Sequence, residues 1–320
     1  MKNIISLLCG ILFSATLAEP VNLFPVRDTT GLYGYTDITG KMVIPSQYKD
    51  ARDFSEGLAC VTVNDKYGYI DKTGKMVIEP QFNIAFAFAN GLARIWGEER
   101  GYIDKTGKMK IKLPQNYDLR DFSNGFAQII IEDTIGFINT KGKIVIPPRF
   151  VKVEDFSEGL AKVESSGRFG FIDTLGSWII KPQFKDAWTF SESLAPVKNN
   201  DNFWGYINHK GEFVIRPQFY SAYGFKQGKA LIIDKSKFGY ISRTGKIIIE
   251  PQFELARDFS EGLAAVQINN KYGFVDTLGN FVIPAQYDFT IEFKNGLARV
   301  SVDSKEGYID KTGKFIWGPK

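Results

Sequence analysis

Residues 66–82 read Lys-Tyr-Gly-Tyr-Ile-Asp-Lys-Thr-Gly-Lys-Met-Val-Ile-Glu-Pro-Gln-Phe, and the rest of the chain is built from copies of this stretch. Counting from the glycine of Tyr-Gly-Tyr, we find nine copies at intervals of 33–35 residues. The nine glycines are Gly34, Gly68, Gly101, Gly136, Gly170, Gly205, Gly239, Gly273 and Gly307. A fixed period of this length is typical of a repeat architecture, in which each unit buries its apolar surface against the next.

Each unit predicts three antiparallel strands. In the second copy they span residues 57–61 (strand A), 67–71 (strand B) and 75–78 (strand C). The turn between strands B and C starts with Asp or Asn in eight of nine copies and has Gly at its fourth position in all nine. An Asp or Asn side chain can bond the backbone two residues on, and Gly accepts the positive φ that closes such a hairpin.

Two aromatic positions recur after strand C. The first is the last residue of Pro-Gln-Phe, and the second is Phe in every copy, as Phe54, Phe88, Phe122, Phe156, Phe190, Phe225, Phe259 and Phe293. An aromatic cage for a ligand is one interpretation. We favour a repeated burial site between neighbouring units, because eight equivalent pairs require eight equivalent environments.

Both faces of each predicted sheet are apolar. Met76 and Ile78 point to one face and Val77 to the other, so both faces require cover, which the sheets of neighbouring units supply. Gly68 and its equivalents would permit close approach of the neighbouring unit. We therefore predict an all-β fold of nine three-stranded repeats in a closed, propeller-like array. An open β-solenoid or superhelix is the alternative.

The N-terminus has the features of a signal peptide. Lys2 is followed by a mostly apolar run at residues 4–13, and Thr16 and Ala18 are small residues at positions −3 and −1 for cleavage before Glu19. The run is shorter than the roughly 20 residues that a membrane helix needs. A buried strand or a retained anchor is the alternative, and a lipoprotein using Cys9 is disfavoured by Leu8. We predict a signal peptide at residues 1–18 and one repeat domain at residues 19–320, exported to the periplasm, cell surface or medium.

Cleavage would leave Cys60 as the single cysteine, so no internal disulfide is expected. Cys60 is the variable residue x of the strand A motif Gly-Leu-Ala-x-Val. Other copies have Arg94, Gln128, Lys162, Pro196, Ala265 or Arg299 at this position. This variety predicts that position x faces solvent, with Cys60 as an incidental exposed thiol.

The composition argues against most catalytic chemistry. His209 is the only histidine and lies in a turn, where we expect a solvated side chain. One histidine and one mature cysteine disfavour a zinc site or a His-dependent triad. Carboxylates such as Asp53, Asp121, Asp155 and Asp258 recur by repeat, as do Glu56, Glu158 and Glu261. A glycosidase pair should instead be unique, so an envelope hydrolase is the least favoured reading. We predict no enzyme activity, and no catalytic, cofactor-binding or metal-binding residues.

Charge is almost balanced, since 40 basic and 36 acidic residues leave a net charge of +4 without a basic arm for nucleic acid. No segment after the N-terminus is long and apolar enough to span a membrane. Lysine follows the turn glycine in six copies, as Lys41, Lys75, Lys108, Lys143, Lys246 and Lys314. We expect a solvated edge that deters strand pairing. A weak polyanion-binding rim is the alternative.

The motif at Trp204-Gly205-Tyr206-Ile207-Asn208, with Gly211 and Pro217-Gln218-Phe219, resembles the bacterial WG (or KWG) repeat family over nearly all of residues 22–320. Trp precedes the repeat glycine only at Trp204. The resemblance implies a non-enzymatic repeat scaffold, and it brings no catalytic residues or cofactor.

Two binding functions follow as hypotheses. The first is an interaction scaffold that contacts a protein of the cell envelope through its turns. The alternative is a lectin-like array that binds envelope glycans through aromatics such as Trp96, Trp178, Trp188 or Trp204, although core filling is the favoured role of these tryptophans. The sequence names neither the partner nor the oligomeric state.

Overall fold

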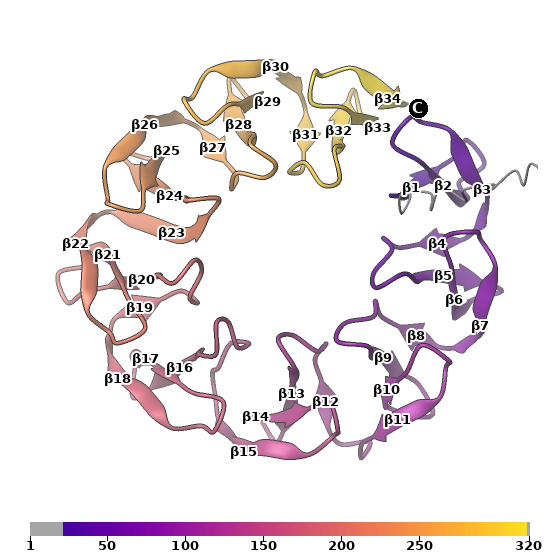
Figure 1. Ribbon diagram of the computed structural model, residues 1–320, viewed down its shortest axis with the longest axis horizontal. Coiled ribbons are helices and arrows are strands. Elements are labelled where there is room, and N and C mark those ends of the chain that lie inside the picture. Colours follow the sequence, from indigo (N-terminus) through magenta and orange to yellow (C-terminus); the bar gives the residue numbers. More distant parts are fainter. Residues whose placement is uncertain (1–21, 319–320) are drawn as a thin grey trace, which may run out of the picture.

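The computed structural model describes residues 22–318, which form strands and turns without a helix. They make nine small antiparallel sheets arranged in a ring around one axis, as Figure 1 shows. The molecule is a nine-bladed β-propeller. The predicted all-β class and closed array are confirmed, and the open superhelix is wrong. Residues 1–18 lie outside the described residues, so the signal peptide stays a prediction.

The blades follow the chain in order. Blade 1 contains β1 (Phe24–Arg27), β2 (Tyr33–Thr36) and β3 (Met42–Tyr48). Blade 2 contains β4 (Asp50–Ala51), β5 (Ala59–Val63), β6 (Lys66–Ile70) and β7 (Met76–Phe82). Blade 3 contains β8 (Ile84–Ala85), β9 (Ala93–Trp96), β10 (Gly101–Ile103) and β11 (Met109–Lys112). Blade 4 contains β12 (Asp118–Leu119), β13 (Phe126–Ile131), β14 (Thr134–Asn139) and β15 (Ile144–Phe150). Blade 5 contains β16 (Ala161–Ser165), β17 (Arg168–Ile172) and β18 (Trp178–Phe184). Blade 6 contains β19 (Asp186–Ala187), β20 (Ala195–Lys198), β21 (Trp204–Ile207) and β22 (Phe213–Phe219). Blade 7 contains β23 (Ser221–Lys226), β24 (Lys229–Asp234), β25 (Lys237–Ser242) and β26 (Ile247–Phe253). Blade 8 contains β27 (Leu255–Ala256), β28 (Ala264–Ile268), β29 (Lys271–Val275) and β30 (Phe281–Tyr287). Blade 9 contains β31 (Phe289–Thr290), β32 (Ala298–Val302), β33 (Lys305–Ile309) and β34 (Phe315–Trp317).

The three predicted strands are present in every blade, and the last of them lies on the outside of the ring in Figure 1. Seven sheets also contain a further strand, usually of two residues, that precedes strand A and pairs with it. In blade 2, Asp50 and Ala51 of β4 pair with Thr62 and Val61 of β5. The expectation of three strands per unit therefore missed one strand, which is too short to show an alternating pattern.

The predicted turns form as expected. In blade 2, the Asp71 carboxylate accepts hydrogen bonds from the backbone N–H groups of Thr73 at 2.9 Å and Lys75 at 3.1 Å. Gly74 has φ +86°, a value that favours glycine over any residue with a Cβ. The Asp or Asn and the Gly of each turn therefore fix the register of the outer hairpin.

The repeat glycine serves its own sheet, which corrects the expectation that it admits a neighbouring unit. Tyr67 pairs with Phe82 and Tyr69 with Ile78, so strand β7 bulges outward opposite Gly68. A Cβ on Gly68 would lie 2.6 Å from the Ile78 carbonyl oxygen and 2.8 Å from the backbone nitrogen of Pro80. The bulge carries the proline of Pro-Gln-Phe, which has no N–H to donate to the ladder.

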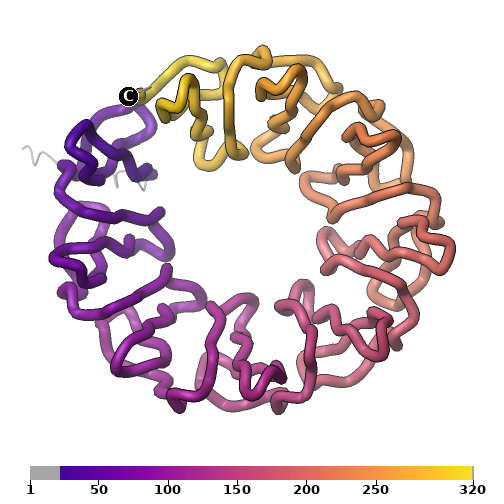
Figure 2. Tube along the Cα trace, turned by 180° about the vertical axis from the view of Figure 1, so that it is seen from behind, coloured from indigo at the N-terminus to yellow at the C-terminus, as the bar shows by residue number. Residues whose placement is uncertain are grey.

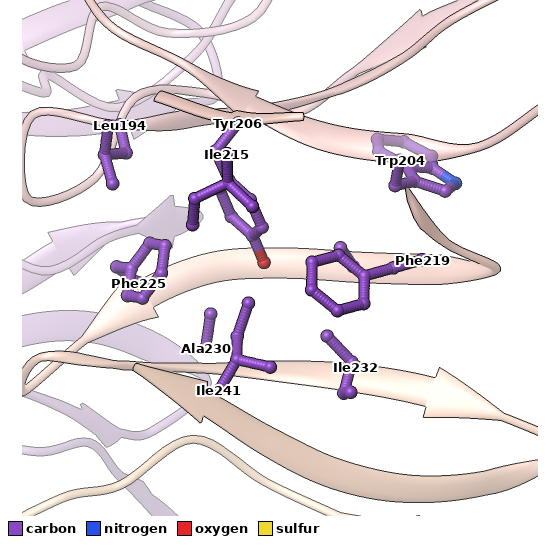
Figure 3. Close-up of a cluster of buried hydrophobic side chains, with 10 residues drawn as sticks. Leu194, Trp204, Tyr206, Ile215, Phe219, Phe225, Ala230, Ile232 and Ile241 are labelled. Atoms are coloured by element: carbon purple, nitrogen blue, oxygen red, sulfur yellow. The ribbon is translucent and has the colours of Figure 1, made fainter. Parts of the chain in front are cut away.

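The core lies between blades, as the paired aromatics predicted. Figure 3 shows one such cluster, in which Tyr206 and Ile215 of blade 6 meet Phe225 and Ile232 of blade 7. The rings of Tyr206 and Phe225 are 4.8 Å apart, and the Tyr206 hydroxyl donates to the Tyr223 carbonyl at 2.8 Å. Ring pairs of this kind recur from Tyr35–Phe54 to Phe274–Phe293. These buried pairs are core, which argues against a ligand cage.

Blade 9 packs against blade 1 and closes the ring without sharing a strand (Figures 1 and 2). The ring of Tyr308 lies 5.5 Å from that of Phe24, and its hydroxyl donates to the Pro25 carbonyl at 3.2 Å. Lys294 also reaches across the junction to Asp53 of blade 2 at 2.8 Å. The closing interface thus also contains a Tyr-to-carbonyl hydrogen bond, whose acceptor lies in strand A of blade 1 rather than before strand A as between other blades.

Candidate functional site

Blades 2–9 each have a loop that precedes strand A, and we call these eight segments the inner loops. They span residues 52–58, 86–92, 120–126, 154–160, 188–194, 223–229, 257–263 and 291–297, and in blade 7 the segment includes the end of β23 and the first residue of β24. Figure 1 shows the turns between β23 and β24 and between β31 and β32 directed toward the centre of the ring. The inner loops therefore form one rim around the axis.

Hydrogen bonds between successive blades hold the rim together. The Ser55 hydroxyl donates to the Phe88 carbonyl at 2.6 Å, and the backbone N–H of Gly91 donates to the Glu56 carboxylate at 3.0 Å. Lys105, from the outer turn of blade 3, donates to the Glu56 carbonyl at 2.8 Å and lies 3.3 Å from its carboxylate. One loop is thus fixed by three contacts to the next blade, which favours a rigid rim.

These contacts repeat around the ring. The serine bond recurs as Ser157 to Phe190, Ser191 to Phe225 and Ser260 to Phe293. The backbone bond recurs as Gly125 to Asn90, Ser193 to Glu158, Gly228 to Glu192, Gly262 to Gln227 and Gly296 to Glu261. The recurring glutamates therefore have a structural role, in agreement with the reading that recurrence indicates turns and edges.

His209 is less exposed to solvent than the sequence suggested. Its ring stacks on Phe190 with centroids 4.4 Å apart and planes 12° apart, and its Nε2 lies 3.0 Å from the Glu158 carboxylate. His209 occupies the place that Lys105 has in blade 3. His209 lies in the predicted turn with its side chain 39% exposed, so the expectation of a solvated turn residue holds in part: Phe190 covers the ring and Glu158 lies beside Nε2.

Cys60 is buried at 2% exposure, which contradicts the predicted solvent-facing position. Its Sγ lies 3.7 Å from the Ala85 carbonyl of the next blade, and burial raises the pKa of the Cys60 thiol to about 12. Position x faces the short strand of the following blade, so Arg94 likewise donates to the Leu119 carbonyl at 2.7 Å. Arg299 remains exposed, because the following blade 1 has no inner loop among the described residues.

Five of the eight inner loops have a carboxylate immediately before their phenylalanine. These carboxylates are Asp53, Asp121, Asp155, Asp258 and Glu292, and the three remaining loops have Ala87, Thr189 and Gly224 there. No lysine or arginine occurs at this position. At this one position the rim therefore has negative charge alone, whereas basic residues such as Arg52, Arg120 and Arg257 directly precede three of the carboxylates.

Residues at position x partner two of these carboxylates. Arg94 Nε lies 2.8 Å from Asp121, and the Gln128 amide donates to Asp155 at 2.7 Å. The pKa of Asp155 is raised, first because the surrounding protein excludes water from its carboxyl, and further by the negative charges of Glu154 and Asp121. The Gln128 bond opposes that shift, as does the positive charge of Arg120.

A cavity of about 650 Å³ opens on the rim at these carboxylates. It spans the inner loops of blades 4–6 and is lined by Asp121, Asp155, Glu154 and Thr189 among others. A second cavity, of about 420 Å³, continues from Thr189 across blades 6–9. The two cavities share that residue, so together they extend along the rim over six blades, 4–9.

In the second cavity, the residues at position x do not partner the rim carboxylates. Asp258 and Glu292 follow blades whose x residues are Leu231 and Ala265, neither of which has a side-chain donor. Burial raises the pKa of Asp258, the charge of Glu292 raises it further, and Lys226 opposes the shift. Among residues 22–318, neither of these two carboxylates accepts a hydrogen bond or forms an ion pair. Equivalent rim positions therefore differ in chemistry between the two halves of the ring.

The four tryptophans considered for glycan binding have different surroundings. Trp204 is 5% exposed and belongs to the core between blades 6 and 7, so core filling is confirmed for this residue. Trp96, Trp178 and Trp188 each line a cavity instead. Trp188 and Trp178 are 43% and 37% exposed, which leaves two aromatic surfaces open to ligands.

The six lysines that follow a turn glycine are exposed, and none of them makes an ion pair within residues 22–318. The polyanion hypothesis therefore stays a prediction. That part of the chain also contains no group of three or more His, Cys, Asp or Glu residues that could hold a metal, and none of its segments is a helix able to cross a membrane.

A family model described as WG containing repeat matches eight tandem segments: residues 33–67, 67–95, 101–133, 135–168, 169–203, 204–237, 238–272 and 272–305. A search of curated proteins gave no match. Among solved structures, the chain is similar to the computationally designed Ika8 protein at 13% identity and TM-score 0.49, covering 83% of this chain and 93% of that one. BamB from Moraxella catarrhalis matches at 10% identity and TM-score 0.46, covering 83% and 97%. Kluyveromyces lactis Hsv2p matches at 12% identity and TM-score 0.42, covering 70% and 91%. At these scores, no functional conclusion follows from the three structures.

Proposed function

Since this chain belongs to the family of proteins built from WG containing repeats, and its repeats close into a ring, we propose that it is a protein-interaction scaffold. The proposed binding surface is the rim of inner loops. The observation that supports it best is the set of blade-to-blade hydrogen bonds to Glu56 and its equivalents, which, together with the bond from Asn124 to the Phe156 carbonyl, link the eight loops in series. A preorganised surface binds with less loss of conformational entropy than separate flexible loops.

The charge of the rim indicates the kind of partner. Five carboxylates occupy one position of the eight inner loops, and no cation occurs at that position, although Arg120 and Lys294 lie in the same loops and Lys294 pairs with Asp53. The Asp121 side chain remains 49% exposed although it is paired with Arg94, so it can accept further hydrogen bonds. We therefore propose that the rim receives an extended, lysine- or arginine-rich segment of a partner protein, with basic side chains in the 650 Å³ cavity.

The test uses a fluorescent peptide of alternating lysine and alanine as the probe. We expect the Asp121→Asn, Asp155→Asn double variant to bind it about 10-fold more weakly, because two attractive charges are lost. Affinity should also fall as the salt concentration rises, because dissolved ions screen the attraction between peptide and carboxylates over a Debye length of about 10 Å at 0.1 M. Fluorescence anisotropy titrations at several salt concentrations measure both effects.

The control variant removes two charges elsewhere. Asp133 and Asp234 are exposed and lie at the turns between strands A and B, at the opposite end of each sheet from the inner loops. Asp133→Asn with Asp234→Asn should leave the affinity within about 2-fold of the parent protein. Equal weakening in both double variants would show net-charge attraction alone and would reject the rim as the site.

The pKa of Asp155 adds a pH dependence. Because this pKa is raised, its carboxylate forms at a higher pH than an ordinary aspartate. Peptide affinity should therefore rise with pH until Asp155 is deprotonated, and fall as pH drops through that raised pKa. The Asp155→Asn single variant should lose this part of the pH profile.

We also propose that the protein is exported and that it has no catalytic role. Export rests on Lys2, the apolar run at residues 4–13, and the small residues Thr16 and Ala18. Expression of the full chain should give a mature protein that begins at Glu19, which N-terminal sequencing and intact mass check. Retention of Met1 in fractionated cells would contradict the export proposal. The non-enzymatic role rests on the structural use of the recurring carboxylates, and release of products from envelope polysaccharide by the pure protein would refute it.

A further inference from the structure

The second rim cavity lies where the repeat departs from its own pattern. It is about 420 Å³ in volume and is lined by Trp188, Tyr223, Lys226, Arg257, Asp258 and Glu292, among others. These residues come from the inner loops of four successive blades, 6–9. The volume falls within the roughly 300–1,000 Å³ that is common for small-ligand pockets.

The polar groups of this cavity lack the partners that their equivalents have. In the first cavity, Asp121 pairs with Arg94 at 2.8 Å and Asp155 accepts from Gln128 at 2.7 Å. The residue placed to partner Asp258 is Leu231, which offers no donor. The Nε of Arg257 is also buried without a hydrogen-bond partner among the described residues. The carboxylates of Asp258 and Glu292 are therefore available as acceptors, and the exposed ammonium group of Lys226 is available as a donor, whereas Arg257 Nε is enclosed by protein.

Two aromatic rings form the remaining wall. Trp188 and Tyr223 have centroids 6.1 Å apart and planes inclined by 27°, which is an offset stack that joins blades 6 and 7. Tyr223 continues the stack to Phe238, at 6.4 Å and 25°. Lys162 Nζ lies 5.4 Å from the Trp188 centroid, and Trp188 nevertheless remains 43% exposed. The cavity thus combines an exposed aromatic surface with hydrogen-bonding groups beside it.

The charges of the lining select against an ionic ligand. Lys226 and Arg257 balance Asp258 and Glu292, so the cavity offers no excess of either sign. A ligand that suits it is neutral, has many hydroxyl groups and has an apolar face. Sugar rings meet all three requirements, since their C–H face packs on an aromatic ring while hydroxyls bond to carboxylate, guanidinium and ammonium groups. We propose that this cavity is a saccharide-binding site, separate from the peptide-binding cavity of blades 4–6.

The experiment is isothermal titration calorimetry of the purified protein with neutral tetrasaccharides of glucose, mannose, galactose and N-acetylglucosamine. Each sugar is added to about 10 mM, so that a dissociation constant of about 1 mM can be measured. At least one should bind. Trp188→Ala should weaken that binding at least about 10-fold, through loss of the aromatic surface. Asp258→Asn, which keeps the shape of the side chain, should weaken it by about 5-fold.

Trp178→Ala is the matched control, because Trp178 has similar exposure but lines a different cavity, near Arg149 and Glu164. It should leave the affinity unchanged, and circular dichroism should show that all variants fold. The proposal is overturned if no tetrasaccharide binds the parent protein, or if Trp178→Ala abolishes binding while Trp188→Ala does not. The Asp121→Asn, Asp155→Asn variant should still bind the sugar. The saccharide proposal and the peptide proposal can therefore fail independently of each other.

Discussion

Gly239→Ala is expected to lower the free energy of unfolding by about 3 kcal/mol, an overpacking cost at the upper end of the usual range. A Cβ at this position would lie 2.6 Å from the Ile249 carbonyl oxygen and 2.7 Å from the backbone nitrogen of Pro251. Both atoms belong to the backbone of the bulge in β26, so relief requires a shift of the strand rather than rotation of a side chain. Nearly the same geometry recurs at Gly68, Gly205 and other repeat glycines.

Gly224→Ala is the matched control in the same blade. Its Cβ would meet the Ser191 Cβ at 3.5 Å, which is ordinary van der Waals contact, and its φ is not positive. Denaturant unfolding should therefore show a change within about 0.5 kcal/mol for Gly224→Ala. Equal stability of the two variants would mean that the bulge yields easily and that the repeat glycine is not a steric requirement.

Tyr206→Ala is expected to cost about 4 kcal/mol, in the range found for truncation of large buried aromatics. Tyr206 is fully buried between blades 6 and 7, where its ring packs on Phe225 and its hydroxyl reaches the Tyr223 carbonyl (Figure 3). Truncation removes the ring contact and the hydrogen bond together. Thermal and denaturant unfolding of the purified variant measure the loss.

Tyr206→Phe separates the two contributions. It keeps the ring and removes one hydrogen bond, so we expect a loss of about 1 kcal/mol. Phe137, Phe171 and Phe274 occupy the equivalent position in other blades, which shows that the site accommodates phenylalanine. A Phe variant as unstable as the Ala variant would show that the hydroxyl, rather than the ring, joins the blades.

Features that recur in every copy were predictable from the sequence. The period of 33–35 residues gave the number of blades, and the Asp and Gly of the turn gave each outer hairpin. The paired aromatics gave the interface between blades. These signals are reliable because the same local chemistry is repeated in each blade.

Features that depend on the relation between blades were missed. Cys60 was placed in solvent because position x varies from Cys to Arg, yet variation there reflects different contacts to the next blade. The β4-type strands have two residues and show no pattern of their own. The contact between His209 and Glu158 is not predictable locally, because the two residues are about 50 positions apart in the sequence. In each case the deciding neighbour belongs to another unit.

The candidate sites illustrate the same point. The rim carboxylates were visible in the sequence as recurring acids, but their recurrence alone pointed to turns. The signal that distinguishes Asp258 from Asp121 is the residue at position x of the preceding unit, Leu231 against Arg94. That comparison becomes meaningful only once the structure shows that position x faces the next blade.

The closure of the ring without a shared strand has an evolutionary consequence. Each blade is encoded by one uninterrupted segment, and blade 9 meets blade 1 through side chains such as Tyr308 and Phe24 rather than through a composite sheet. A gene duplication or deletion of one period therefore adds or removes a whole blade and never leaves a partial sheet at the junction. Descent within such a lineage can proceed by change in blade number, and each new blade brings one more inner loop on which selection can act.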